Sequence, residues 1–233
     1  MKGFILAAGE GTRLRPLTLE IPKPLLPVGK IPIITYLVDL YLKYGVDDIK
    51  IGVQQSHLED FYKWKATYFP RERIELVVES KPSGTFTPIA KNVDAKWFSE
   101  PIVVSNGDEL KELNLKRMID WHFKRGAIAT IGLVKVENPQ NYGVAKIKKD
   151  KIVEFIEKPK YPPSSYINSG IYVLNPEIRK YYPPKTKFAM VENDLFPQLA
   201  KEGKLHGFKW QGRWQDVGTF ERWNEAILGW NKK

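Results

Sequence analysis

Short apolar runs alternate with amphipathic stretches along the first half of the chain. The first run leads into a glycine turn, and the run over 102–105 ends at Asn106-Gly107-Asp108. Two of the amphipathic stretches have clear helix boundaries. One opens at Pro32 and ends at Gly45, and the other follows the cap residue Asn114 and ends at Gly126. Because strand–helix alternation implies right-handed crossovers, this half should form a mostly parallel sheet.

Two segments of this half carry other local signals. Residues 14–31 contain four prolines, which predict an ordered loop rather than a helix. Ser56 and Glu59 have the spacing of a capping box for a helix that ends near Tyr68. The predicted elements are strands 2–6, 49–53, 74–78 and 102–105, and helices 33–44, 57–68, about 88–97 and 115–125.

The second half changes character, because its apolar runs are joined by short connections. This pattern predicts strands over 128–136, 144–148, 152–157 and 167–174 that add to the sheet in antiparallel fashion, and a last helix over about 220–228. No internal repeat or linker interrupts the sequence. A single mixed α/β domain over 1–233 is therefore expected.

Composition narrows the chemistry. The chain has no Cys, which excludes disulfides, a thiol nucleophile and a Cys-ligated zinc site. No apolar run approaches the ~20 residues that span a bilayer, and the run from Phe4 to Ala8 is too short for a signal peptide. We expect a cytoplasmic protein without a membrane partner.

The net charge of +10 comes from 37 basic and 27 acidic side chains. The excess is spread along the chain and forms no polybasic arm, which favours a phosphate-rich small ligand over nucleic acid. A lysine-rich surface that only keeps the protein in solution explains the same total.

A glycine turn follows the first strand directly. Gly9 and Gly11 allow the backbone to approach a phosphate, and Arg13 can clamp phosphate oxygens. The turn is not a dinucleotide fingerprint, because Leu14 occupies the third glycine position, and no Walker A lysine follows. A tight turn with a surface arginine is the alternative. Lys23, held between two prolines, suggests a second phosphate contact.

With these residues the chain resembles the sugar-phosphate nucleotidyltransferases. The resemblance covers nearly the whole chain. It rests on LAAGEGTRLRPLT, PKPLLPV, Ser105-Asn106-Gly107-Asp108, Tyr142-Gly143-Val144, Glu157-Lys158-Pro159, Asn168-Ser169-Gly170 and Trp214-Gln215-Asp216-Val217-Gly218-Thr219. It implies a Rossmann-like three-layer fold with a mixed, mostly parallel central sheet. It also implies transfer of a nucleotidyl group from an NTP to a sugar-1-phosphate, with release of pyrophosphate. A homo-oligomer is compatible with the family. Some relatives carry a C-terminal left-handed β-helix, which we do not expect in a chain that ends at Lys233.

The resemblance also implies roles for individual residues. Catalysis would rest on charge neutralisation and positioning by Arg13, Lys23, Asp108 and Lys158. Asp108 and Asp216 would hold Mg²⁺, although a turn-forming and a helix-capping aspartate are the structural alternatives. The sugar phosphate would bind at Gly143, Glu157, Lys158 and Asn168, with a surface ion pair as the alternative for Glu157 and Lys158. The nucleotide would bind at Ala8, Gly9, Gly11, Thr12, Arg13, Glu79, Gly84 and Thr85.

The segment expected to recognise the base departs from the family. Phe86 and Thr87 stand where the family usually has Ala-Gly, so the resemblance does not fix the shape of the base pocket. Glu79 is an acceptor when ionised and suits the donor edge of guanine. Guanylyl transfer to mannose- or heptose-1-phosphate is preferred, and thymidylyl or uridylyl transfer is the alternative. A regulatory homologue that binds nucleotide-sugar without turnover is a second alternative. The three histidines are expected to be structural or surface residues.

Overall fold

A computed structural model describes residues 1–230 of the chain. These residues form two compact units, each assembled from segments far apart in sequence. Unit 1 contains residues 1–82, 105–113 and 212–230, and unit 2 contains residues 83–104 and 114–211. The strand β6 (Ile102–Asn106) supplies residues to both units.

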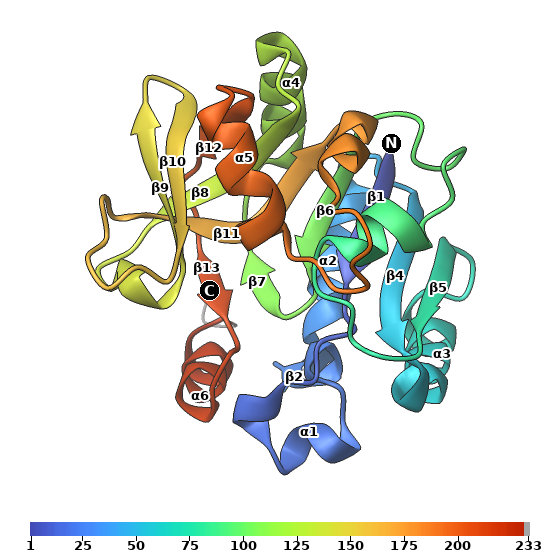
Figure 1. The fold of residues 1–233 in the computed structure, drawn as a ribbon. Coiled ribbons are helices and arrows are strands. Elements are labelled where there is room, and N and C mark those ends of the chain that lie inside the picture. The colour runs from blue at the N-terminus through green and yellow to red at the C-terminus, as the bar shows by residue number, and fades with distance from the viewer. Residues whose placement is uncertain (231–233) are drawn as a thin grey trace. The chain divides into compact units, whose positions relative to one another are not determined.

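Unit 1 contains a parallel sheet in the order β5-β4-β1 (Figure 1). Strand β1 (Lys2–Leu6) pairs with β4 (Asp48–Gln54), and β4 pairs with β5 (Arg73–Glu79). Strand β4 is buried along most of its length, as expected for the central strand of the three. The helices of this unit include α2 (Ile33–Lys43) and α3 (Leu58–Tyr68).

A second core in unit 1 joins segments that the sequence separates widely. It packs residues from the proline-rich loop, α2, a short strand pair and the last helix. Its buried members are Leu14, Leu26, Val28, Ile33, Leu110, Val217, Ala226 and Trp230. The elements around it are α1 (Leu17–Glu20), β2 (Pro27–Val28), β3 (Ile31–Pro32), β7 (Glu109–Lys111), β13 (Trp214–Asp216) and α6 (Phe220–Gly229). This core sets the relative position of the glycine turn and the loops at Asp108 and Asp216.

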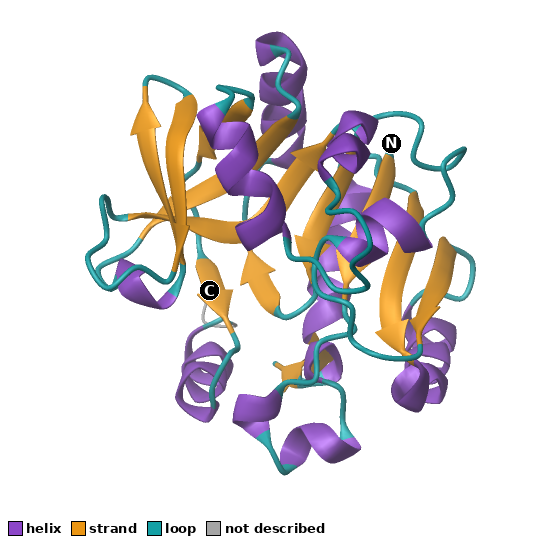
Figure 2. Ribbon diagram, viewed as in Figure 1, coloured by secondary structure: helices purple, strands orange, loops and turns teal. Residues whose placement is uncertain are grey.

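Unit 2 is built on strands that are mainly antiparallel (Figures 1 and 2). One pairing in this unit, that of β8 with β12, is parallel. The buried His122 on α4 accepts or donates hydrogen bonds with Thr130 and Asn175, which is a structural role. The elements are α4 (Leu115–Arg125), β8 (Ala129–Lys135), β9 (Gly143–Lys148), β10 (Lys151–Glu157), β11 (Tyr166–Leu174), α5 (Phe196–Lys201) and β12 (Leu205–Lys209).

The predicted mixed α/β class is confirmed, with parallel strands early and antiparallel strands late in the chain. Three local predictions are wrong. The stretch between Pro16 and Pro22 is free of proline and forms one helical turn. Ser56 lies in a 3-10 turn ahead of α3 and bonds Gln54, so it caps no helix. Only 88–92 of the expected 88–97 helix is helical, as a single wide turn. No helix within residues 1–230 is both long and apolar enough to cross a membrane.

Candidate functional site

The glycine turn after β1 is held by its own backbone and by two side chains. Gly11 has φ of 60°, and its carbonyl accepts a hydrogen bond from the Thr18 hydroxyl at 2.9 Å. A Cβ at Gly11 would lie 2.9 Å from Thr18, so both conformation and space require glycine. The Gln54 amide donates to the Ala8 carbonyl at 2.7 Å. Thr12 and Arg13 follow in a 3-10 turn and are exposed to solvent.

Lys23 and Asp108 form an ion pair inside unit 1. Lys23 is only 9% exposed, and its two flanking prolines fix the 3-10 turn that carries it. Burial alone would raise the pKa of Asp108. The ammonium groups of Lys23 and Lys111 outweigh burial and lower the pKa, so this carboxylate is charged at neutral pH.

The neighbouring Glu109 has a different role. Its carboxylate accepts hydrogen bonds from Asn106 at 2.9 Å and Trp214 at 2.8 Å, and it lies 3.4 Å from the Lys111 ammonium. Burial raises the pKa of Glu109, while Lys111 opposes that shift. These contacts attach β7 to β13, so Glu109 serves the architecture.

Asp216 lies next to Asp108 through strand pairing. Asp216 is opposite Glu109 in the β13–β7 register, and the Val217 N–H donates to the Asp108 carbonyl at 3.2 Å. The Asp216 carboxylate accepts from Arg222 at 2.7 Å and from the Gly218 N–H at 2.7 Å. Thr219, not Asp216, caps α6. The helix-capping alternative for Asp216 is therefore wrong.

The carboxylates of Asp108 and Asp216 fit a hard divalent cation by donor type. Mg²⁺ in phosphate-transfer sites is commonly held by one or two carboxylates, with substrate phosphates and water completing the shell. Within residues 1–230 no group of three or more His, Asp or Glu side chains is arranged to hold a metal.

Glu79 ends β5 and is only 4% exposed. One carboxylate oxygen lies 3.2 Å from the position of a Cβ at Gly52, on the adjacent strand β4. The side chain thus points across the sheet of unit 1 rather than into solvent.

Unit 2 brings three of the predicted sugar-phosphate residues, Gly143, Glu157 and Lys158, together at the start of β9 and the end of β10. Gly143 pairs with Glu157, and a Cβ at Gly143 would lie 2.8 Å from a Glu157 carboxylate oxygen. Lys158 has φ of 46°, and its N–H donates to the Tyr142 carbonyl at 3.0 Å. Its exposed ammonium lies 3.2 Å from Glu157. Asn168 on β11 donates to the Tyr172 hydroxyl at 2.8 Å and accepts from the Gly170 N–H at 2.9 Å.

Sequence analysis missed Glu192, which lies in unit 2 and is 7% exposed. Its carboxylate accepts the Thr85 hydroxyl proton at 2.6 Å. Burial raises the pKa of Glu192 to about 7; the Thr85 bond opposes the shift, and the nearby charges of Glu157 and Lys158 act in opposite directions. The sequence signal is the polar run Glu192-Asn193-Asp194 between the apolar residues 189–191 and 195–196. Arg222, the partner of Asp216, was also missed.

Phe86 and Thr87 do not line an open pocket. Phe86 is fully buried and its ring meets that of Tyr182 edge-on, with centroids 5.4 Å apart. Thr87 is 6% exposed. Both side chains are therefore used in packing within unit 2.

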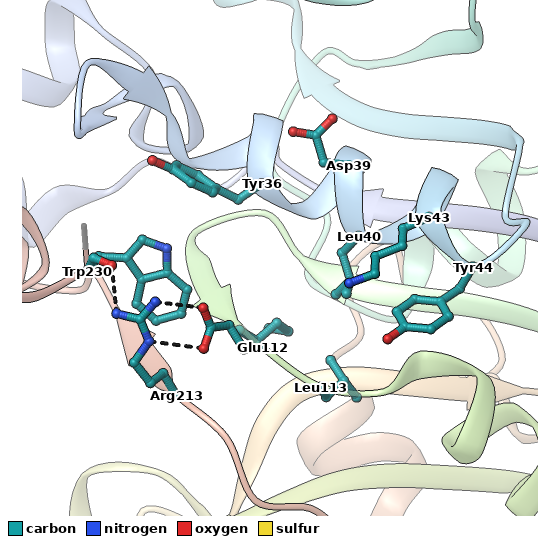
Figure 3. A pocket seen from close by; sticks show the side chains of 10 residues that line it. Tyr36, Asp39, Leu40, Lys43, Tyr44, Glu112, Leu113, Arg213 and Trp230 are labelled. Atoms are coloured by element: carbon teal, nitrogen blue, oxygen red, sulfur yellow. Dashed lines mark hydrogen bonds and ion pairs between the residues drawn. The ribbon is translucent and has the colours of Figure 1, made fainter. Parts of the chain in front are cut away.

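A cavity of about 700 Å³ lies in unit 1 beside α2 (Figure 3). Arg213 forms a two-pronged ion pair with Glu112 at 2.6 and 3.0 Å, and its guanidinium lies 4.7 Å from the centroid of the Trp230 ring. Lys111 also lines this cavity. None of the predicted site residues does.

Comparison with known proteins identifies the class. The family model described as "Nucleotidyl transferase" matches residues 2–232, so it spans segments of both units. The chain belongs to this family.

Two similar curated proteins share one name. The chain is 38% identical to a mannose-1-phosphate guanyltransferase of Aspergillus fumigatus, and the match covers 94% of this chain and 61% of that protein. It is 37% identical to the enzyme of the same name from Saccharomyces cerevisiae, with the same coverage. The chain therefore spans about three fifths of the length of these relatives.

A solved structure from Bacillus anthracis has the same fold. It is provisionally named a glucose-1-phosphate thymidylyltransferase and was determined in complex with a sucrose. The TM-score is 0.89 at 29% sequence identity, and the match covers 98% of this chain and 94% of that one.

Proposed function

We propose that the chain catalyses transfer of a nucleotidyl group from an NTP to a sugar-1-phosphate, with guanylyl transfer to mannose-1-phosphate as the preferred reaction. The observation that carries the proposal is the assembly of Lys23, Asp108 and Asp216 in one unit. The names of the relatives support this choice of substrates. The proposal includes heptose-1-phosphate as a second candidate acceptor.

Unit 1 would bind the nucleotide triphosphate. The turn at Ala8, Gly9, Gly11 and Thr12 offers backbone N–H groups to phosphate oxygens. Arg13 is exposed and free to contact a phosphate, and Lys23 supplies a positive charge of restricted motion. These cations lower the repulsion between two polyanions, which is the main barrier to their approach.

Unit 2 would bind the sugar phosphate. Gly143 leaves space beside Glu157, whose carboxylate can accept sugar hydroxyls. Lys158 presents its exposed ammonium to the phosphate, and Asn168 adds an amide that can donate and accept. An oxygen of the sugar phosphate then attacks the α-phosphorus in line, and pyrophosphate leaves. No covalent enzyme intermediate is needed.

Asp108 and Asp216 are proposed to hold Mg²⁺. Bound there, the ion would neutralise phosphate charge that develops during the displacement. Lys23 keeps Asp108 ionised and Arg222 orients Asp216, so both carboxylates are prepared as ligands.

Glu79 supports GTP as the nucleotide, because a carboxylate is an acceptor for the guanine donors. Thymidylyl transfer to glucose-1-phosphate is the second candidate, and the name given to the Bacillus anthracis protein supports it. Uridylyl transfer is the third. A silent regulatory homologue has no physical need for Arg13, Lys23, Asp108, Lys158 and Asp216 together.

The test is pyrophosphate release with Mg²⁺, measured over four NTPs and a panel of sugar-1-phosphates. Release that requires GTP and mannose-1-phosphate together is the expected result. Release with dTTP or UTP instead would overturn the role of Glu79 and keep the reaction class. Nucleotide binding without release by any pair would favour the regulatory alternative.

A further inference from the structure

The irregular segment 182–191, here called the strap, lies along the loop 83–87 within unit 2. The Phe86 N–H donates to the Ala189 carbonyl at 2.8 Å, and the Ala189 N–H donates to the Ser83 carbonyl at 3.2 Å. A Cβ at Gly84 would lie 2.3 Å from the Ala189 carbonyl oxygen. The loop and the strap are therefore in direct backbone contact.

A directional chain of hydrogen bonds holds the strap to the loop. The Tyr182 hydroxyl donates its single proton to the Thr186 carbonyl at 3.2 Å, since a carbonyl can only accept. The Thr87 hydroxyl, 3.0 Å from the Tyr182 oxygen, must then be the donor of that bond. Thr87 in turn accepts from the Ala189 N–H at 3.0 Å. The protons of the two hydroxyl groups therefore have one place each, while the Ala189 N–H is shared between Thr87 and the Ser83 carbonyl.

The strap also occupies the side chain of Thr85. The Thr85 hydroxyl accepts from the Val191 N–H at 3.0 Å and donates to Glu192 at 2.6 Å. Its one proton is therefore used internally. Within residues 1–230, the backbone N–H groups of Gly84 and Thr85 have no hydrogen-bond partner. The loop can thus offer its backbone donors, rather than the Thr85 hydroxyl, to a ligand.

We propose that Thr87 and Tyr182 are positioning residues that order the Gly84–Thr85 loop before the nucleotide binds. The inference rests on the proposed function and on the family resemblance, which implies that Gly84 and Thr85 contact the nucleotide. A loop already held in its bound conformation loses less entropy on binding. Loss of the Thr87 and Tyr182 hydrogen bonds should weaken nucleotide affinity and leave the chemical step unchanged.

The experiment compares two variants that remove hydrogen bonds between the strap and the loop with two variants that retain them. Thr87→Val keeps the shape and removes both bonds, and Tyr182→Phe removes one hydroxyl. Thr87→Ser retains the hydroxyl and should restore the wild-type behaviour. Tyr181→Phe is the matched control, because the Tyr181 hydroxyl donates to Glu202 at 2.6 Å away from the loop.

The readouts are the Kd for each of GTP, dTTP and UTP by calorimetry, the kcat and KM for pyrophosphate release, and the melting temperature. Thr87→Val and Tyr182→Phe should raise the Kd and KM of the NTP that the wild type uses by about fivefold to tenfold. Their kcat and their KM for the sugar phosphate should stay within twofold of wild type, as should every constant of Thr87→Ser and Tyr181→Phe.

Wild-type NTP affinity in Thr87→Val would overturn the inference and leave the proposed function intact. A fall in kcat with unchanged Kd, or equal weakening in the two controls, would also overturn it. A wild-type protein that binds no NTP would refute the proposed function itself, and the inference with it.

Discussion

The ammonium group of Lys23 and the carboxylate of Asp108 form a partly buried ion pair, although 85 residues separate them in the sequence. The pair joins the proline-rich loop to the turn after β6. It keeps Asp108 ionised and limits the motion of Lys23. This arrangement suits the charge-neutralising roles proposed for the two residues.

Asp108→Asn should lower the rate of pyrophosphate release by at least ~100-fold, the scale of removing one electrostatic stabiliser. The amide is uncharged and is a poor ligand for a hard cation. Asp120→Asn is the matched control, because Asp120 is an exposed carboxylate paired with Lys116 at 2.7 Å. Near-normal turnover by a folded Asp108→Asn protein would remove Asp108 from the proposed metal site.

Gly218→Ala should reduce turnover about tenfold to a hundredfold with little loss of stability. The added Cβ would lie 2.7 Å from the Asp216 carboxylate and 3.1 Å from the Arg13 guanidinium. Both functional groups must then move. Gly229→Ala is the control, since a Cβ there meets nothing within 4 Å. Steady-state kinetics and thermal melting of both variants check this, and full activity in Gly218→Ala would contradict it.

Gly84→Ala should be clearly more destabilising than Gly45→Ala. Both glycines have a left-handed backbone conformation, with φ of 88° at Gly84 and 75° at Gly45. An alanine at either position carries a conformational cost of about 1–2 kcal/mol. Only Gly84 faces a backbone carbonyl, at 2.3 Å from the new Cβ, which adds about 1–3 kcal/mol of overpacking. Urea unfolding of both variants measures the difference. Equal losses in the free energy of unfolding would show that the strap moves away from the added methyl group without an energetic cost.

The free energy of unfolding should depend on the ionisation of Glu192. Its pKa is about 7 in the folded protein against an ordinary value of 4.5. Because the pKa of Glu192 is raised in the folded protein, its protonated form contributes favourably to the free energy of unfolding. This contribution is complete below pH 4.5 and is lost as pH rises through 7. Wild type should therefore lose up to about 3 kcal/mol relative to Glu192→Gln between pH 4.5 and pH 8.

Urea unfolding at several pH values measures this difference directly. Glu154→Gln, a change at an exposed carboxylate paired with Lys146, is the control and should show no comparable slope. A flat difference between wild type and Glu192→Gln would show that Glu192 stays charged in the folded protein.

Local signals account for the elements that were predicted well. Asn114 caps α4 through its side chain and Gly126 ends the helix at φ of 59°, as the sequence indicates. Such signals act over a few residues and need no partner from elsewhere. They fail where a neighbouring turn competes, as at Ser56, whose hydroxyl bonds Gln54 instead of capping α3.

The sequence by itself determined the mixed α/β class, the glycine turn and the identity of the charged residues that resemble the family motifs. Those features depend on local spacing and on residue type. Only the tertiary structure decided the pairings Lys23–Asp108, Asp216–Arg222, Thr85–Glu192 and Thr87–Tyr182. Each pairing depends on where distant or looping backbone segments come to lie, and the raised pKa of Glu192 depends on how many atoms exclude water around it. Neither the side-chain pairings nor the raised pKa is determined by the residues adjacent in the sequence.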